Sequence, residues 1–139
     1  MAYTPFHLEI HTPQRTFFDG EVEALVFRSN DGEACILNMH APMVASLAAG
    51  TLRFMIGGEW TQVVNSDGMV EARPDGAYVF AQTVELPEEI DENRALAKKE
   101  QLEEQLRQSR SMTEYRLFQL ELAKQLARLS ATTKTSQTK

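Results

Sequence analysis

Three polar side chains near the N-terminus have types and a spacing that could do chemistry. His7, Glu9 and His11 occupy alternate positions, so they share one face of an expected strand. Imidazole and carboxylate groups on one face can bind a metal ion, but such a site needs a further ligand, and no residue is assigned to that role by its spacing. We therefore expect these side chains to form the solvated face of an amphipathic strand.

A second pair, Cys35 and His40, has the types of a nucleophile and a base. Cys35 lies in the apolar run Ala34–Leu37, where a cysteine usually acts as a small buried side chain, and no Asn or Asp can be assigned to orient His40. The chain also lacks a Gly-x-x-x-x-Gly-Lys-Ser/Thr phosphate loop, so a nucleotide site would rest on Arg, Lys and helix N-termini. We expect no catalytic residue and no metal ion.

Short strands with tight turns should position these residues. Phe6, Leu8 and Ile10 alternate with the polar residues above, and the same period of two recurs up to residue 83. Turn signals of the Asp-Gly, Gly-Gly and Pro-Asp-Gly kinds separate the strands, and they supply the positive φ that hairpins need. Residues 1–86 therefore predict an antiparallel β-sandwich or flattened barrel.

The composition changes near Pro87, because all seven Gly lie before it and every Lys lies after it. Residues 88–107 are dominated by good helix formers. The sequence Ser111-x-x-Glu114 is a capping box for a second helix. We therefore expect residues 87–139 to form an antiparallel two-helix hairpin.

The second helix carries one apolar stripe. Its members step by three and four: Tyr115, Phe118, Leu122, Leu126 and Leu129. We expect this stripe to pack against the first helix and the sandwich. The tail from Ala131 is rich in Thr, Ser and Lys, and we expect it to fray.

Charge is also unevenly placed along the chain. The net charge is −6, yet residues 110–139 contain six basic and two acidic side chains. The acidic first half argues against a nucleic-acid partner, whereas the basic second helix is suited to an acidic protein surface. A single cysteine excludes an internal disulfide, and there is neither a signal-peptide pattern nor an apolar run of about 20 residues that could span a membrane. Any membrane contact should be indirect, through a protein partner.

Seven short segments, spread over both halves, together resemble one family. They occur in this order: Phe6-His7-Leu8-Glu9-Ile10, Phe18-Asp19-Gly20-Glu21-Val22, Asp31-Gly32-Glu33, His40-Ala41-Pro42, Gly50-Thr51-Leu52-Arg53, Val70-Glu71-Ala72-Arg73-Pro74 and Ile90-Asp91-x-x-Arg94-Ala95. Their common order and spacing make the resemblance specific. By these motifs the chain resembles the epsilon subunit of bacterial F-type ATP synthases over essentially its full length.

The resemblance implies a fold, a role and a set of partners. The fold is a β-sandwich of about ten short strands in residues 1–86, followed by a helical hairpin in residues 87–139. The role is that of a non-catalytic rotor subunit of the central stalk, which couples the gamma subunit to the membrane c-ring during ion-driven ATP synthesis. The implied place is peripheral, at the cytoplasmic face of the cell membrane within the ATP synthase complex.

The resemblance also implies contact residues. The loop with Glu33 and the turn with His40 match the end of the family that faces the c-ring and gamma. In many members the hairpin extends along gamma into the catalytic head of alpha and beta subunits and inhibits ATP hydrolysis. Basic residues of the second helix then meet an acidic segment of beta, and Lys124 and Arg128 are the matching residues here.

The chain departs from the family pattern just before His40. It has Asn38-Met39 where the family often has Pro-Gly. Glycine at such a place permits a positive φ, and Asn tolerates this conformation better than most residues. We therefore expect the turn to survive, with Asn38 adopting this conformation.

Some members of the family bind ATP on the folded hairpin through an Ile/Leu-Asp-x-x-Arg-Ala motif. The matching residues are Ile90, Asp91, Arg94 and Ala95, together with Arg128 on the second helix. Gln101 and Lys124 stand where strong binders have Arg, and the loss of bidentate contacts should weaken binding. The resemblance implies ATP as a regulatory ligand and no required cofactor. Alternatively, Asp91 and Arg94 only cap and solvate a helix start.

Two other functions remain as alternatives to a stalk subunit. One is a small metal-dependent β-barrel enzyme that would use His7, Glu9 and His11. The other is a free-standing nucleotide-sensing module, which would use the hairpin motif without a rotor. The metal content of the purified protein distinguishes the first alternative from a stalk subunit. Recovery of rotor subunits together with the chain distinguishes the second.

Overall fold

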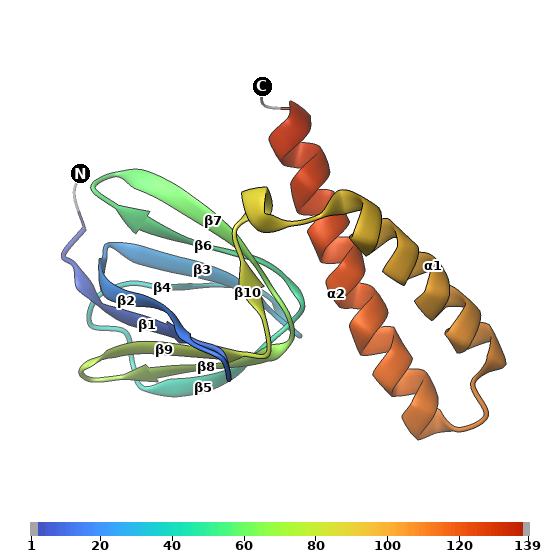
Figure 1. The fold of residues 1–139 in the computed structure, drawn as a ribbon. Helices are drawn as coiled ribbons and strands as arrows, with labels where there is room; N and C mark the ends of the chain where they lie inside the picture. Colours follow the sequence, from blue (N-terminus) through green and yellow to red (C-terminus); the bar gives the residue numbers. More distant parts are fainter. Residues whose placement is uncertain (1–2, 138–139) are drawn as a thin grey trace.

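The computed structural model describes the backbone of residues 3–137 and the side chains of residues 3–132. Two five-stranded sheets stack in the first part of the chain, and two helices lie to one side of them (Figure 1). No helix within these described residues is long and apolar enough to cross a membrane. The architecture confirms the predicted sandwich of ten strands followed by two helices.

The first sheet has the strand order β2-β1-β9-β8-β5. Its strands are β1 (Phe6–His11), β2 (Thr16–Val22), β5 (Met43–Leu47), β8 (Gly68–Arg73) and β9 (Gly76–Ala81). β1 runs parallel to β9, with Leu8 paired to Ala77, whereas the other neighbours are antiparallel. The parallel pair departs from the fully antiparallel sheet that we predicted, because β1 and β9 are distant in sequence and no tight turn joins them.

The second sheet has the strand order β10-β7-β6-β3-β4, and all of its pairs are antiparallel. Its strands are β3 (Ala24–Ser29), β4 (Gly32–Ile36), β6 (Gly50–Ile56), β7 (Glu59–Asn65) and β10 (Val84–Glu85). The short strand β10 is the last strand of the sandwich, and the chain passes from it toward the helices (Figure 1).

The core of the sandwich lies between the two sheets, where alternate side chains of each strand meet. Its most enclosed members, each with at most 1% of its surface exposed, include Leu8, Ile10, Leu25, Phe27, Val63 and Val79. The side chains that form this cluster or pack against it all come from Phe6–Leu86. The sandwich therefore has a core of its own, to which no described side chain of the helices contributes.

A 3₁₀ turn, η1 (Pro87–Glu89), links the sandwich to α1 (Glu92–Gln108) and α2 (Met112–Gln137). Asp91 caps α1, because its Oδ1 accepts a hydrogen bond from the backbone N–H of Arg94 at 3.1 Å. Ser111 caps α2 in the same way, since its Oγ accepts from the backbone N–H of Glu114 at 3.1 Å. The predicted capping sequence therefore begins the second helix.

The apolar stripe of α2 is only partly buried, which corrects the prediction. Phe118, Leu122 and Leu129 are half-buried, but Tyr115 and Leu126 are 39% and 46% exposed. Gln125 is buried instead. The reason is that α2 packs along α1 and contacts β6 and β7, and its described apolar contacts with the sandwich come from Ala127 and Ala131, which do not belong to the stripe.

The second helix also continues further than predicted. We expected residues from Ala131 onward to fray, but α2 extends to Gln137. Ala131 is buried against Val64 and Ile90, and Oγ1 of Thr132 donates to the backbone oxygen of Arg128 at 3.0 Å. These contacts stabilise the helix beyond Leu129, the last residue of the apolar stripe. Residues 138 and 139 of the predicted tail lie outside the described residues.

Candidate functional site

A cavity of about 650 Å³ lies between the helical hairpin and β10. Its size falls in the range of small-molecule sites. The side chains that matter for its chemistry are Glu85, Asp91, Arg94, Gln101, Lys124 and Arg128. The structure therefore brings together the two helices and the strand end, and five of these six residues were singled out in the sequence.

Arg128 and Glu85 join the hairpin to the sandwich across this cavity. Nη2 of Arg128 donates to Oε2 of Glu85 at 3.1 Å, and Nε of Arg128 lies 3.0 Å from Oε1. Nη1 of Arg128 donates to Oε1 of the buried Gln125 at 3.0 Å. The two charged side chains are only 19% and 23% exposed, so water screens them less than it screens a surface ion pair. The pair therefore fixes α2 against β10.

The motif at the start of α1 divides between the cavity and the protein interior. Asp91 and Arg94 line the cavity, and the guanidinium of Arg94 is exposed. Ile90 and Ala95 are 9% and 0% exposed, and Ile90 packs against Val64 of β7. The carboxylate of Asp91 is engaged as the helix cap. The capping role that we weighed for Asp91 is therefore present, and Arg94 is the motif residue that is free to meet a ligand.

Sequence reasoning missed Glu85, which is the residue paired with Arg128. It also missed Lys98 and Glu121, whose side chains line the same cavity. No local pattern marks Glu85, because its partner lies 43 positions away. The cavity carries both acidic and basic side chains, so a phosphate group that used Arg128 would first have to displace the carboxylate of Glu85.

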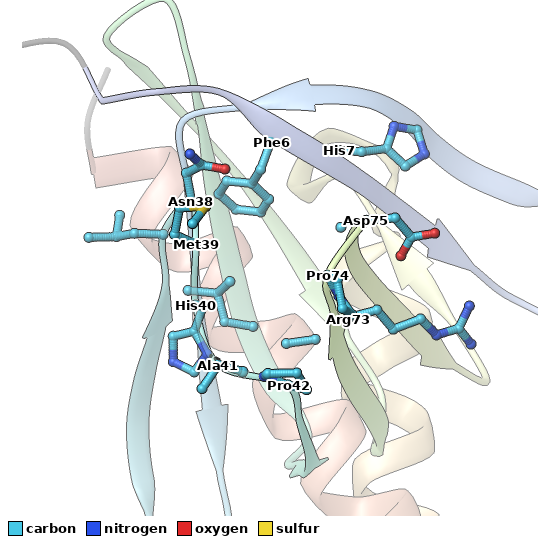
Figure 2. A pocket seen from close by; sticks show the side chains of 14 residues that line it. Phe6, His7, Asn38, Met39, His40, Ala41, Pro42, Arg73, Pro74 and Asp75 are labelled. Atoms are coloured by element: carbon cyan, nitrogen blue, oxygen red, sulfur yellow. Dashed lines mark hydrogen bonds between the residues drawn. The ribbon is translucent and has the colours of Figure 1, made fainter.

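A second cavity, of about 510 Å³, lies beside the turn between β8 and β9 (Figure 2). The loop Leu37–Pro42 forms one wall of it. Met39 in this loop has 91% of its surface exposed and a φ of 68°, and Nδ1 of the exposed His40 donates to the backbone oxygen of Ala41 at 2.8 Å. The positive φ expected at Asn38 therefore falls one residue later, on a side chain that favours it less.

Glu33 and His40 do not lie together in this structure. Glu33 is near the beginning of β4, beside the exposed Arg53, whose Nη2 is 3.8 Å from Oε1 of Glu33. His40 follows the end of the same strand, beyond Ile36. Because a strand of this length spans roughly 15 Å, a partner that contacts both residues must cover the length of β4.

Cys35 is exposed, which corrects the expectation that it is a buried side chain. It lies on β4, the edge strand of the second sheet, and points away from the core because its neighbours Ala34 and Ile36 take the inner positions. Partial desolvation raises the pKa of its thiol. A raised pKa disfavours the reactive thiolate, so the geometry gives no support to a Cys35–His40 nucleophilic pair.

His7, Glu9 and His11 share the outer face of the first sheet, as predicted. Nε2 of His7 and Nε2 of His11 each hydrogen-bond the carboxylate of Glu9, at 2.8 Å and 2.7 Å. The three side chains are between 24% and 30% exposed. They form a row of polar side chains along β1, and each of them has a hydrogen-bond partner.

Two protein-family models match successive parts of the chain. The beta-sandwich domain of the ATP synthase delta/epsilon chain matches residues 5–87, and the long alpha-helix domain of the same chain matches residues 88–133. The ATP synthase epsilon chain of Ruminiclostridium cellulolyticum is 44% identical over 127 residues, which cover 91% of this chain and 95% of that relative. The epsilon chain of Caldanaerobacter subterraneus subsp. tengcongensis is 41% identical over 130 residues, which cover 93% and 94% of the two chains.

Solved structures share the arrangement of sandwich and helices. A chain in the Euglena gracilis mitochondrial ATP synthase aligns with a TM-score of 0.77 at 22% identity, covering 94% of this chain and 83% of that chain. A chain in the central stalk and c-ring of the Tetrahymena thermophila mitochondrial ATP synthase aligns with a TM-score of 0.64 at 11% identity, covering 95% and 99%. At these identities the likeness establishes the fold.

Proposed function

Because the chain belongs to the family of ATP synthase delta and epsilon chains, we propose that it is a rotor subunit of the central stalk of an F-type ATP synthase. It couples gamma to the membrane c-ring during ion-driven ATP synthesis and has no catalytic site of its own. The observation that carries this function is the match to a named epsilon chain at 44% identity over 95% of that relative. The matches do not support the metal-dependent enzyme or the free-standing nucleotide sensor.

The two parts of the chain divide this work. Residues 1–86 hold gamma and the c-ring, with Glu33 on β4 and the loop around His40 as contact sites. Residues 87–139 are a movable hairpin that reaches the catalytic head. The subunit is peripheral to the membrane and lies on its cytoplasmic side.

Recovery of the partners tests the proposed function. A tagged copy of the full chain, expressed in the source cells, should bring gamma, the c-ring and the alpha and beta subunits out of detergent-solubilised membranes in constant proportion. A tagged chain with the core substitution Leu8→Asp, which places a charge where Leu8 is fully buried, is the matched control and should recover none of them. Recovery of the full chain without gamma contradicts the assignment.

The hairpin can act as a reversible inhibitor of ATP hydrolysis, because little holds it to the sandwich. The described apolar cluster between them contains Val64, Ile90 and Ala131, which together contribute on the order of 5 kcal/mol. The Arg128–Glu85 ion pair adds to this contact. In the inhibiting position Lys124 and Arg128 meet an acidic segment of beta, so Arg128 must first leave Glu85. The exposed apolar side chains of α2 are then available to gamma.

The cavity between the hairpin and β10 binds ATP as a regulatory ligand and thereby favours the folded hairpin. Arg94, Lys124 and Arg128 lie around it and can meet phosphate oxygens. Arg128 is engaged by Glu85, and Gln101 offers no charge, so binding is weak. Any ligand that bridges α1 and α2 in this position holds the hairpin closed.

Calorimetric titration of the isolated chain with ATP tests this site. We expect weak binding that Arg94→Ala reduces by about 10-fold or more, since a hydrogen bond to a charged group contributes about 1.5–3 kcal/mol. Glu85→Gln should strengthen binding, because it frees Arg128. Arg107→Ala is the matched control, since Arg107 is also on α1 but pairs with Glu104. No heat at millimolar ATP, or equal affinity in the Arg94 and Arg107 variants, rules the site out.

A further inference from the structure

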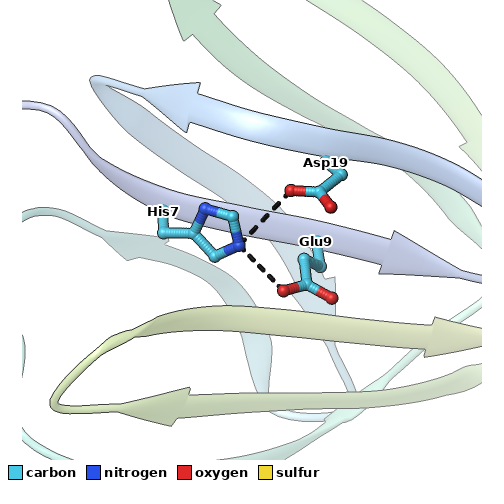
Figure 3. Close-up of side chains that lie close together, drawn as sticks. All are labelled: His7, Glu9 and Asp19. Atoms are coloured by element: carbon cyan, nitrogen blue, oxygen red, sulfur yellow. Dashed lines mark hydrogen bonds and ion pairs between the residues drawn. The ribbon is translucent and has the colours of Figure 1, made fainter.

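The outer face of the first sheet holds a cluster of side chains that the proposed function does not use. In the pairing of β1 with β2, Glu9 lies opposite Asp19 and His7 lies opposite Glu21. Nε2 of His7 points between two carboxylates, 2.8 Å from Oε2 of Glu9 and 3.4 Å from Oδ1 of Asp19 (Figure 3). One imidazole nitrogen and two carboxylate oxygens therefore converge from two adjacent strands.

The spacing of these atoms is close to that around a metal ion. One ligand atom from each of His7, Glu9 and Asp19 lies within 4.8 Å of the other two. Ligand atoms about 2.0–2.2 Å from a tetrahedral Zn²⁺ are about 3.3–3.5 Å apart. The distance of 3.4 Å from His7 to Asp19 already has this value, and the distance of 2.8 Å from His7 to Glu9 is about half an ångström shorter than it.

A neighbouring histidine positions one of the carboxylates. Nε2 of His11 bonds Oε1 of Glu9 at 2.7 Å, and Nδ1 of His11 bonds Oγ1 of Thr16 at 3.1 Å. This leaves Oε2 of Glu9 directed at His7. Ligating carboxylates are commonly oriented in this way by a second hydrogen-bonded group, so Glu9 is held ready to bind without a rearrangement of β1.

The local field also favours positive charge at this position. Nδ1 of His7 lies 3.6 Å from Oε1 of Glu21, which adds a third carboxylate around one imidazole. A divalent cation would gain from the same charges, and the exposed side of Asp19 leaves room for water as a fourth ligand.

We propose that His7, Glu9 and Asp19 form a binding site for a divalent transition-metal ion, with Zn²⁺ as the first candidate and His11 as the residue that positions Glu9. The ion would tie β2, an edge strand of the first sheet, to β1. This site is structural, and we assign no reaction to it. It does not rest on the proposed function, since it needs only the residues of β1 and β2.

Zinc titration of the full chain by calorimetry tests the site, at about pH 8 so that the proton competes little with the metal. Cys35→Ser serves as the background, because it removes a thiol that also binds zinc. We expect one Zn²⁺ per chain, and at least 10-fold weaker binding in His7→Ala and Asp19→Asn. His11→Gln should weaken binding 10- to 100-fold, as outer-shell partners of metal ligands typically do. His40→Ala, which alters the remaining histidine, should leave binding unchanged.

Thermal unfolding gives a second readout in case one variant folds poorly. Zinc should raise the melting temperature of the full chain and of the His40 variant, because an ion bound only to the folded state stabilises it. Zinc should not raise the melting temperature of Asp19→Asn. The side chain of Asp19 is 61% exposed, so its replacement does not disturb the packing of the core. Equal zinc affinity in the full chain, His7→Ala and Asp19→Asn overturns the proposal, as does binding that disappears with Cys35→Ser.

Discussion

Removal of residues 87–139 should raise ATP hydrolysis by the assembled enzyme several-fold and leave the sandwich folded. The fold survives because, among the side chains that the structure describes, those of the core cluster all come from residues 6–86. Hydrolysis should rise because Lys124 and Arg128, the basic residues that we propose to contact beta in the inhibiting position, are lost with the hairpin. The measurement is the ATPase rate of the enzyme rebuilt with the full chain or with residues 1–86, together with circular dichroism of the shortened chain.

Two variants of the full chain make this experiment sharper. Glu85→Gln removes the partner of Arg128 in the folded hairpin but keeps Arg128 available to beta. At an ATP concentration too low to fill the weak site between the hairpin and β10, it should therefore lower hydrolysis below that of the unaltered enzyme. Arg107→Ala alters an exposed residue of α1 and should leave the rate unchanged. If the shortened chain and Glu85→Gln both leave hydrolysis at the original rate, the hairpin is not an inhibitor.

Of the glycine-to-alanine substitutions in this chain, Gly68→Ala should lower the stability most. A Cβ on Gly68 would overlap the backbone oxygen of Phe80 and lie 3.0 Å from Cα of Ala81. Gly68 is paired to both neighbouring strands, to Leu47 of β5 and to Ala81 of β9, so the backbone has no free side toward which to move. We expect a loss of about 3 kcal/mol or more in the free energy of unfolding, and a fall of about 10 °C in melting temperature.

Gly50→Ala is the matched control for this substitution. Gly50 also begins a strand, but its added Cβ would meet nothing within 4 Å and its φ is not in the left-handed region. Its free energy of unfolding should change by no more than about 0.5 kcal/mol. Equal stability of the two variants in urea unfolding would show that β8 is not held between β5 and β9 as described.

The sequence allowed the class of fold to be predicted because two of its signals are local. Alternation of Phe6, Leu8 and Ile10 with polar residues reports a strand with one buried face, and all three are indeed buried. Ser111 and Glu114, which lie within four residues of each other, indicate where a helix begins. The parallel pairing of β1 with β9 was missed, because it depends on the packing of distant segments and leaves no periodic trace.

The candidate site was predictable only in part, for the same reason. Asp91 and Arg94 form a contiguous motif, and both line the cavity. Glu85 was missed because its importance comes from Arg128, on a helix that returns to the sandwich after a long excursion. The apolar stripe of α2 was overestimated, since the period of a helix shows which side is apolar but not whether a partner covers it.

The central claim is that this chain holds the rotor together, and a photo-reactive residue in place of Met39 tests it most directly. Met39 is the most exposed of the large apolar side chains described. During the purification of the tagged chain from membranes, illumination should link this position to a c-subunit or to gamma. A residue at position 107, on the far part of α1, should not form the c-subunit link. Illumination that links position 39 to neither rotor subunit, in a preparation with intact ATP synthase, would contradict the account.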